Sequence, residues 1–193
     1  MEPGNYFERG DETMNVVFML EEPSMKAFLD TLLPKIDPGL DFLTIKHNGK
    51  NALKKSLPRK LAGWIDPDVK FIVVMDQDDA DCKKVKSELE EICAPYRHEV
   101  LIRIACHELE SWYFGDLNAV EKAFNINNIS TISRKRKYRN PDEIVNAKEE
   151  FRRIVPSYQQ VSGAETIANY MDCEKNSSVS FRVFVEGVQR FAR

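Results

Sequence analysis

The sequence lacks three features that mark common classes of protein. No apolar run approaches the roughly 18 residues of a membrane-spanning helix, and residues 1–13 contain no basic or apolar segment of the kind found in signal peptides. The four cysteines form no Cys-x-x-Cys pair, which excludes a zinc ribbon and a thioredoxin-like redox motif. The net charge is only −3, so the chain as a whole is not a basic nucleic-acid binder, although a local basic patch stays open. We therefore expect a cytoplasmic protein with free thiols and no membrane partner.

The sequence does contain regularly alternating strand and helix patterns. Hydrophobic residues make up 42% of the 193 and charged residues 31%, a globular balance that excludes disorder, collagen and coiled coil. Short apolar runs predict buried strands over residues 16–20, 41–46, 71–75 and 100–105. Amphipathic spacing predicts helices over 23–36, 53–65 and 85–93. This alternation predicts a Rossmann-like α/β fold, with a doubly wound, mostly parallel four-stranded sheet and flanking helices.

The pattern becomes helical beyond about residue 107. Asn140-Pro141-Asp142-Glu143 predicts the start of a helix that continues to Ile154, and Ser162-Gly163-Ala164-Glu165 reads as the capping box of the next helix. An apolar stripe over 181–191 predicts a last helix. We therefore divide the chain into a flexible leader (1–13), an α/β core (14–116) and a helical C-terminal extension packed on the core (117–193).

Acidic residues cluster after three of the predicted strands. Ligands of open parallel sheets bind beyond the carboxyl ends of the strands, so Glu21, Asp76 and Asp78 converge if the first and third strands are neighbours. Within a strand, Asp76 and Asp78 would share a face, and at a strand end both can reach one ion. Several adjacent carboxylates need a cation to stay ionised, and magnesium is a hard cation that prefers oxygen ligands. Glu108 and Glu110 follow the fourth strand nearby.

Each of these features also has a purely structural interpretation. An acidic residue after a buried strand is common, and Asp79 or Asp81 is a candidate N-cap for the following helix. Trp112 and Tyr113 fit a hydrophobic core better than a base-stacking surface.

Cationic residues gather in two other places. Five of the six residues over 134–139 are basic and surround Tyr138, which is available to stack on a base; the five are Arg134, Lys135, Arg136, Lys137 and Arg139. Lys46 and Lys50 follow the second strand, where they would contact phosphate. The alternative is that both sets are solvated surface, with the 134–139 loop balancing the acidic segment after Pro141.

Several of these segments resemble one known fold family. Residues 20–24 are similar to the opening motif of TOPRIM domains, and Met75-Asp76-Gln77-Asp78 resembles their Asp-x-Asp motif. Residues 103–112, 158–167 and 178–191 resemble a bacterial TOPRIM-like family of unknown function, often encoded beside AAA-type ATPases in mobile or defence loci. The resemblance therefore extends over nearly the whole chain from Met14, and it implies that the α/β core is TOPRIM-like.

The resemblance implies magnesium- or manganese-dependent phosphodiester chemistry, as in a nuclease acting on DNA or RNA. It makes Glu21 an acid–base residue or metal ligand, and it makes Asp76 and Asp78 metal ligands. Glu108 and Glu110 would then serve a second ion, as in nucleases of the overcoming-lysogenization-defect type. The genomic setting of the family further implies a defence effector working with an ATPase partner.

Two departures from the family pattern keep other functions open. Glu22 stands where the family has glycine, and Met25 replaces the second glutamate of the opening motif. These changes favour the alternative of a non-catalytic TOPRIM-like module that binds nucleic acid or a partner protein. A phosphoacceptor receiver domain is a third hypothesis, but no lysine follows the fourth predicted strand, where a receiver requires one.

Overall fold

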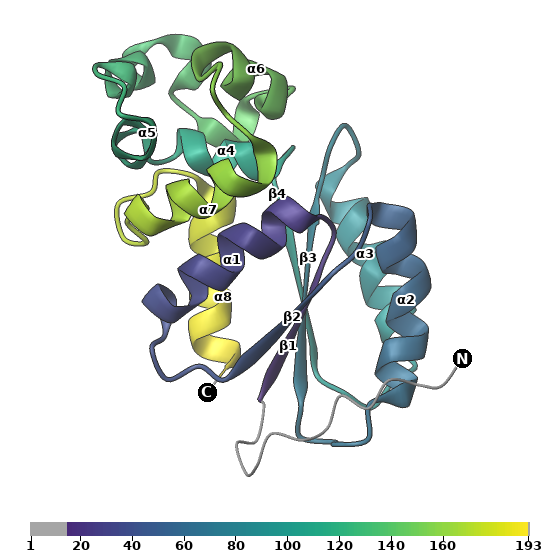
Figure 1. Ribbon diagram of the computed structural model, residues 1–193. Coiled ribbons are helices and arrows are strands. Elements are labelled where there is room, and N and C mark those ends of the chain that lie inside the picture. The colour runs from purple at the N-terminus through teal and green to yellow at the C-terminus, as the bar shows by residue number, and fades with distance from the viewer. Residues whose placement is uncertain (1–14, 193) are drawn as a thin grey trace.

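The computed structural model describes residues 15–192, which form a parallel sheet with helices on both faces (Figure 1). The strands of this part of the chain are β1 (Val16–Leu20), β2 (Phe42–Lys46), β3 (Lys70–Asp76) and β4 (Val100–Ala105). They pair in the order β2-β1-β3-β4, and every pairing is parallel. The predicted four-stranded parallel sheet is therefore confirmed, while the leader expected over residues 1–13 lies outside the described residues.

Three helices connect the strands, and the rest of the described chain is helical. The connecting helices are α1 (Pro23–Ile36), α2 (Lys50–Gly63) and α3 (Cys82–Cys93). The later helices are α4 (Leu109–Phe114), α5 (Leu117–Phe124), α6 (Ala147–Ile154), α7 (Gln160–Tyr170) and α8 (Val179–Phe191), with 3-10 turns η1 (Ile129–Arg134), η2 (Arg136–Tyr138) and η3 (Pro141–Glu143). No helix within residues 15–192 has the length and apolar character needed to cross a membrane.

The sheet separates two apolar clusters, because successive side chains of a strand point to opposite faces. Val17 and Met19 of β1 and Val73 and Met75 of β3 pack with α2 and α3. The alternate residues of these strands pack with α1, α8 and the helices α4, α5 and α7. Figure 1 shows α2 and α3 on one side of the sheet, α1 and α8 on the other with α7 packed against α1, and α4 to α6 beyond the carboxyl ends of the strands. Side chains leaving those ends therefore meet the helical part of the chain.

The helix predicted over 53–65 ends two residues early. α2 ends at Gly63, and Trp64 adopts an extended backbone that packs its ring against Phe71, with ring centroids 5.5 Å apart. Pro67 disfavours a helical conformation in the residue before it, so the chain turns here. Ile65, which the periodicity placed on the buried face, is 83% exposed.

The helix predicted to start at Pro141 is interrupted. Its first turn is only the 3-10 turn η3, and α6 begins at Ala147 after Asn146, which adopts a left-handed backbone with φ 54°. The Asp142 carboxylate accepts hydrogen bonds from the backbone amides of Val179 and Ser180 at the start of α8. Asp142 is therefore fixed to another helix, and its segment does not extend into α6.

The predicted capping box at residues 162–165 is also wrong. α7 begins at Gln160, and Ser162 lies inside the helix. Gly163 faces the Tyr158 ring so closely that an added Cβ would lie 2.5 Å from the ring atom Cδ2. The glycine that seemed to belong to a cap thus allows close packing between α7 and Tyr158.

Candidate functional site

Glu21 and Asp76 meet at the carboxyl edge of the sheet. Asp76 is the last residue of β3, and Glu21 directly follows the neighbouring strand β1. One carboxylate oxygen of Glu21 (Oε2) accepts a hydrogen bond from the Asp76 backbone amide at 2.9 Å. The two residues are only 5% and 3% exposed, and the Asp76 oxygen Oδ1 has no hydrogen-bond partner. Two of the three acids expected to converge are therefore adjacent and buried.

Burial disfavours the charged forms of both acids. It raises the pKa of Glu21 to about 7, although the Asp76 amide and the Lys50 ammonium lower it in part. Burial also raises the pKa of Asp76 well above its ordinary value, and the nearby charges of Glu21 and Glu110 raise it further. A cation placed here would relieve both effects.

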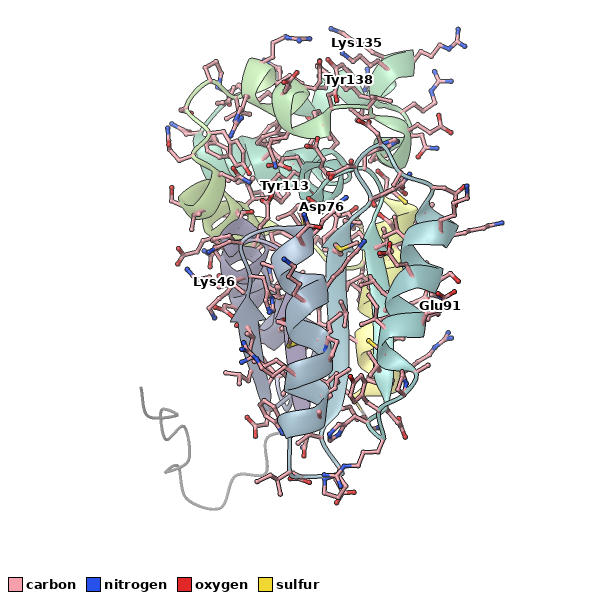
Figure 2. All side chains as sticks on the ribbon, turned by 90° about the vertical axis from the view of Figure 1, so that its right-hand side faces the viewer. Lys46, Asp76, Glu91, Tyr113, Lys135 and Tyr138 are labelled. Carbon is pink, nitrogen blue, oxygen red and sulfur yellow. The ribbon has the colours of Figure 1, made fainter. Side chains whose placement is uncertain are left out.

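Glu110 brings a third buried carboxylate from the helical part of the chain. It lies in the first turn of α4 and is 1% exposed. Its Oε1 accepts a hydrogen bond from the Tyr158 hydroxyl at 2.9 Å, while its Oε2 has no partner. Burial raises the pKa of Glu110 to about 7, against the lowering effects of Lys148 and Tyr158. Figure 2 shows Asp76 and the nearby Tyr113 where the sheet meets the helical extension.

Lys148 of α6 supplies positive charge beside these acids. Its ammonium lies 3.7 Å from Glu22 and 3.9 Å from Glu108, and its backbone amide donates to Glu108 at 2.8 Å. Burial alone would lower the pKa of Lys148, but the carboxylates around it, Glu110 first among them, raise it overall. Sequence reasoning assigned no function to Lys148 or Tyr158. For Lys148, the available signal was a lysine within the apolar stripe of its predicted helix.

Asp78 lies in a different environment, although it follows Asp76 by only two residues. β3 ends at Asp76, so the alternation of a strand no longer directs Asp78. Asp78 adopts a left-handed backbone with φ 52°, and its amide donates to the His107 carbonyl at 2.6 Å. Its exposed carboxylate pairs with the Lys50 ammonium at 2.6 Å. The structure therefore joins a predicted metal ligand to a predicted phosphate contact.

The chemistry of the buried oxygens fits a magnesium ion, although the acids do not form a closed cage. Within residues 15–192, no three acidic, histidine or cysteine side chains lie close enough together to enclose a metal ion. Magnesium, however, keeps several water ligands and is bound by only one or two protein carboxylates in many sites. Asp76 and Glu110 each present a buried carboxylate oxygen without a partner, beside Glu21. Asp76, together with either Glu21 or Glu110, would hold the ion, and water would complete its coordination.

The basic residues over 134–139 are exposed but lie apart from the acids. Figure 2 shows Lys135 and Tyr138 at the far end of the helical extension, away from Asp76. The Tyr138 ring stacks on Phe114, with centroids 5.6 Å apart, and its hydroxyl donates to Glu150. One face of this ring is therefore covered, contrary to the expectation of a free stacking platform. The cationic side chains of this loop are Arg134, Lys135, Arg136, Lys137 (which pairs with Glu150 at 2.6 Å) and Arg139.

Two further expectations have clear outcomes, and one stays a prediction. Lys46 is exposed at the end of β2, and its contact with phosphate stays a prediction. Asp81 caps α3, since its carboxylate accepts a hydrogen bond from the Lys84 amide at 2.9 Å. Trp112 and Tyr113 are fully buried, so their assignment to the core is confirmed.

A family model described as "Domain of unknown function (DUF4276)" matches residues 20–189. The chain belongs to the DUF4276 family. The match includes every candidate site residue, from Glu21 to Lys148. No curated protein sequence matches this DUF4276 chain.

Two solved structures share the fold of this DUF4276 protein. The C-terminal region of the Burkholderia pseudomallei OLD protein has a TM-score of 0.53 and 14% sequence identity, and the likeness covers 95% of this chain and 100% of that one. The corresponding region of the Xanthomonas campestris pv. campestris OLD protein has a TM-score of 0.51 and 12% identity, and the likeness covers 92% and 95% of the two chains. The likeness confirms the predicted fold class, and at these identities it establishes the fold alone.

Proposed function

We propose that this DUF4276 protein is a metal-dependent phosphodiesterase that cleaves DNA or RNA at the carboxyl edge of its sheet. The observation that carries the proposal is the pair of buried, unpartnered oxygens on Asp76 and Glu110, next to Glu21. The TOPRIM-like motifs and the fold shared with the C-terminal regions of OLD proteins support the same chemistry.

Each residue of the site has a role in this proposal. Asp76, together with either Glu21 or Glu110, would hold the ion, and magnesium bound there would supply Lewis-acid polarisation of a phosphoryl oxygen. Burial raises the pKa of Glu21 to about 7 in the metal-free chain, and a bound cation would lower it by favouring the carboxylate that serves as a ligand. Lys148 offsets part of the negative charge around the ion.

Asp78 and Lys50 have linked roles. The Asp78 carboxylate can contribute to ion binding only by leaving Lys50, with which it now pairs at 2.6 Å. That exchange frees the Lys50 ammonium to contact a phosphate of the substrate. A single rearrangement would thus complete the metal site and create a phosphate contact.

The cleavage test compares Asp76 with Asp79, an acid three residues further along the chain. We expect the purified chain to cleave single- or double-stranded nucleic acid with magnesium or manganese, and to stop when a chelator is added. Asp76→Asn should abolish this activity, whereas Asp79→Asn should retain it because Asp79 is an exposed neighbour outside the site. Undiminished cleavage by Asp76→Asn, in a variant with wild-type thermal stability, would contradict the proposal.

The basic surfaces would hold the substrate. We propose phosphate contacts from Lys46, Lys50 and the loop over 134–139. Replacing Arg134, Lys135 and Arg136 with alanine should reduce the slope of log K against log salt by about 0.7–0.9 for each lost contact. Lys137→Ala is the matched control, because Lys137 already pairs with Glu150 and should change the slope less. If the wild-type chain and all variants have equal slopes, this loop does not contact the phosphates.

A non-catalytic nucleic-acid-binding module is the second candidate function. No group of three metal ligands is assembled among the described residues, and Met25, which replaces a family glutamate, is 1% exposed in the core. Glu22, which replaces a family glycine, accepts a hydrogen bond from Gln160 at 2.7 Å. Nucleic-acid binding that is insensitive to chelator, without cleavage at millimolar manganese, would support this function over the nuclease.

A further inference from the structure

The short helix α4 carries most of the unpartnered polar groups in the described part of the chain. Within residues 15–192, the buried side-chain atoms without a hydrogen-bond partner are Asp76 Oδ1, Glu110 Oε2, Ser111 Oγ and the Tyr113 hydroxyl. Glu110, Ser111 and Tyr113 all belong to α4. The proposed function uses the two carboxyl groups, so the hydroxyl groups of Ser111 and Tyr113 have no role in it.

The Tyr113 hydroxyl lies in an environment where a hydroxyl needs a hydrogen bond. Tyr113 is fully buried, and its ring packs against the rings of Phe28, Phe151 and Tyr158, with centroids 5.5, 5.3 and 6.1 Å apart. A phenylalanine would make the same ring contacts without burying a polar atom. Because an unpaired buried hydroxyl is unfavourable, the tyrosine indicates a partner that is not a protein atom.

Tyr113 lies on the same side of α4 as Glu110. The two residues are three positions apart, and side chains at this spacing share a helix face. Tyr158 contacts both of them, because its ring lies beside the Tyr113 ring and its hydroxyl donates to Glu110 Oε1 at 2.9 Å. Figure 2 shows Tyr113 near Asp76, where the sheet meets the helical extension. The hydroxyl therefore belongs to the same buried cluster as the two free carboxyl oxygens.

The free groups of this cluster complement the hydrogen bonds of a water molecule. An internal water in a protein typically makes about three hydrogen bonds, two as donor and one or more as acceptor. Asp76 Oδ1 and Glu110 Oε2 would accept from the water, and the Tyr113 hydroxyl would donate to it. Ser111 follows Glu110 directly, so it points to another side of α4 and does not take part.

We propose that Tyr113 is a positioning residue of the site, and that its hydroxyl donates a hydrogen bond to a water molecule held by Asp76 and Glu110. This water is bound in the metal-free chain, and it completes the coordination of a cation bound by the same acids. The second part of the inference rests on the proposed function, whereas the first part does not. Hydrogen-bond partners of this kind orient the groups around a metal ion, and their loss typically weakens metal binding by about 10–100-fold.

A high-resolution crystal structure of the metal-free wild-type chain tests the first part directly and needs no variant. We expect an ordered water molecule at about 2.5–3.0 Å from the Tyr113 hydroxyl, from Asp76 Oδ1 and from Glu110 Oε2. The proposal fails if this water is absent, or if the Tyr113 hydroxyl bonds to a protein atom.

Tyr113→Phe removes only the hydroxyl, so the direction of its effect on the metal-free chain is informative. We expect the melting temperature to fall by about 2–4 °C, because the water and both acids lose a hydrogen-bonded neighbour. Removing a hydroxyl that has no partner would raise the melting temperature instead. Tyr170→Phe is the matched control and should change nothing, since Tyr170 is 49% exposed. An unchanged or higher melting temperature for Tyr113→Phe would contradict the proposal.

Manganese binding distinguishes this inference from the proposed function. The electron paramagnetic resonance signal of free Mn²⁺ gives the Kd without any cleavage. We expect Tyr113→Phe to raise the Kd by about tenfold, and Tyr170→Phe to leave it unchanged. Equal Kd values for the wild-type chain and Tyr113→Phe would overturn the role of Tyr113 toward the cation, even in an active nuclease. A wild-type chain that binds no manganese would overturn the proposed function and the cation-binding part of this inference. The crystal structure and the melting temperatures would still decide the water-binding part.

Discussion

The carboxyl edge of the sheet has a buried half and an exposed half, and an aspartate side chain has a different environment in each. In the buried half, Asp76 lies beneath the helical extension with an unpartnered oxygen and the neighbouring acids Glu21 and Glu110. In the exposed half, Asp78 pairs with Lys50 in solvent. Two aspartates of one motif thus differ in burial, charge environment and partners. Burial, rather than position in the motif, identifies the acid that most needs a cation.

The largest expected effect is on catalysis. Asp76→Asn should lower the rate of metal-dependent cleavage by at least about 100-fold, since it removes the central ligand, or roughly 3 kcal/mol of transition-state stabilisation. Asp78→Asn should lower it by about tenfold or less, because the exposed acid first has to leave Lys50. Single-turnover rates at saturating magnesium measure both effects. A larger loss of cleavage rate for Asp78→Asn than for Asp76→Asn would contradict the conclusion that the buried acid is the more important one.

Sequence patterns predict the edge itself but not the partners of its buried half. The apolar runs of the sequence located the ends of β1 and β3. Glu21 and Asp76 meet because these two strands are neighbours in the sheet. Glu110 was expected, from the family resemblance, as a ligand of a second ion, and the structure places it near Asp76.

The missed residues come from far along the chain. Lys148 of α6 and Tyr158, which lies between α6 and α7, reach the site through tertiary packing, for which the only local signal was a lysine in the apolar stripe of a predicted helix. The alternation that placed Asp78 beside Asp76 failed because β3 ends at Asp76 and Asp78 adopts a left-handed backbone.

The next largest effect is a loss of stability as the pH rises. Glu21 and Glu110 have pKa values of about 7 in the folded chain against 4.5 ordinarily, so the folded state binds more protons than the unfolded state between those values. The free energy of unfolding should therefore fall as the pH rises from about 4.5 to 7. Each group contributes up to about 3 kcal/mol to this fall.

Urea unfolding between pH 5 and 8 measures this dependence. Glu110→Gln should flatten it, because the amide cannot ionise, whereas Asp79→Asn, a change at an exposed acid outside the site, should leave it unchanged. Magnesium should restore stability at pH 8 by binding the buried carboxylates of the folded state. A pH profile that is equally steep in Glu110→Gln would show that the buried acids are not its source.

A smaller effect on stability is expected from Lys148, the cationic residue of the buried half. Lys148→Met should lower the free energy of unfolding by about 1–2 kcal/mol at pH 8 and by less at pH 5, where Glu110, with a pKa of about 7, is protonated. This is below the 3–5 kcal/mol typical of a broken buried ion pair, because the ammonium lies 3.7 and 3.9 Å from its partners. Lys86→Met, which breaks only an exposed pair with Glu90, is the matched control. Equal losses at both pH values would contradict the electrostatic role of Lys148.

The smallest expected effect on stability comes from the ion pair of the exposed half. The ion pair of Lys50 and Asp78 should contribute less than about 1 kcal/mol, because the Asp78 side chain is 53% exposed and water screens the charges. A double-mutant cycle with Lys50→Met and Asp78→Asn isolates this pair from the second hydrogen bond that Lys50 donates, to the Gln77 carbonyl. The coupling should shrink further in molar salt. A coupling above about 2 kcal/mol would mean that Asp78 is held too firmly to exchange Lys50 for a metal ion. This result would contradict the proposed contribution of Asp78 to ion binding.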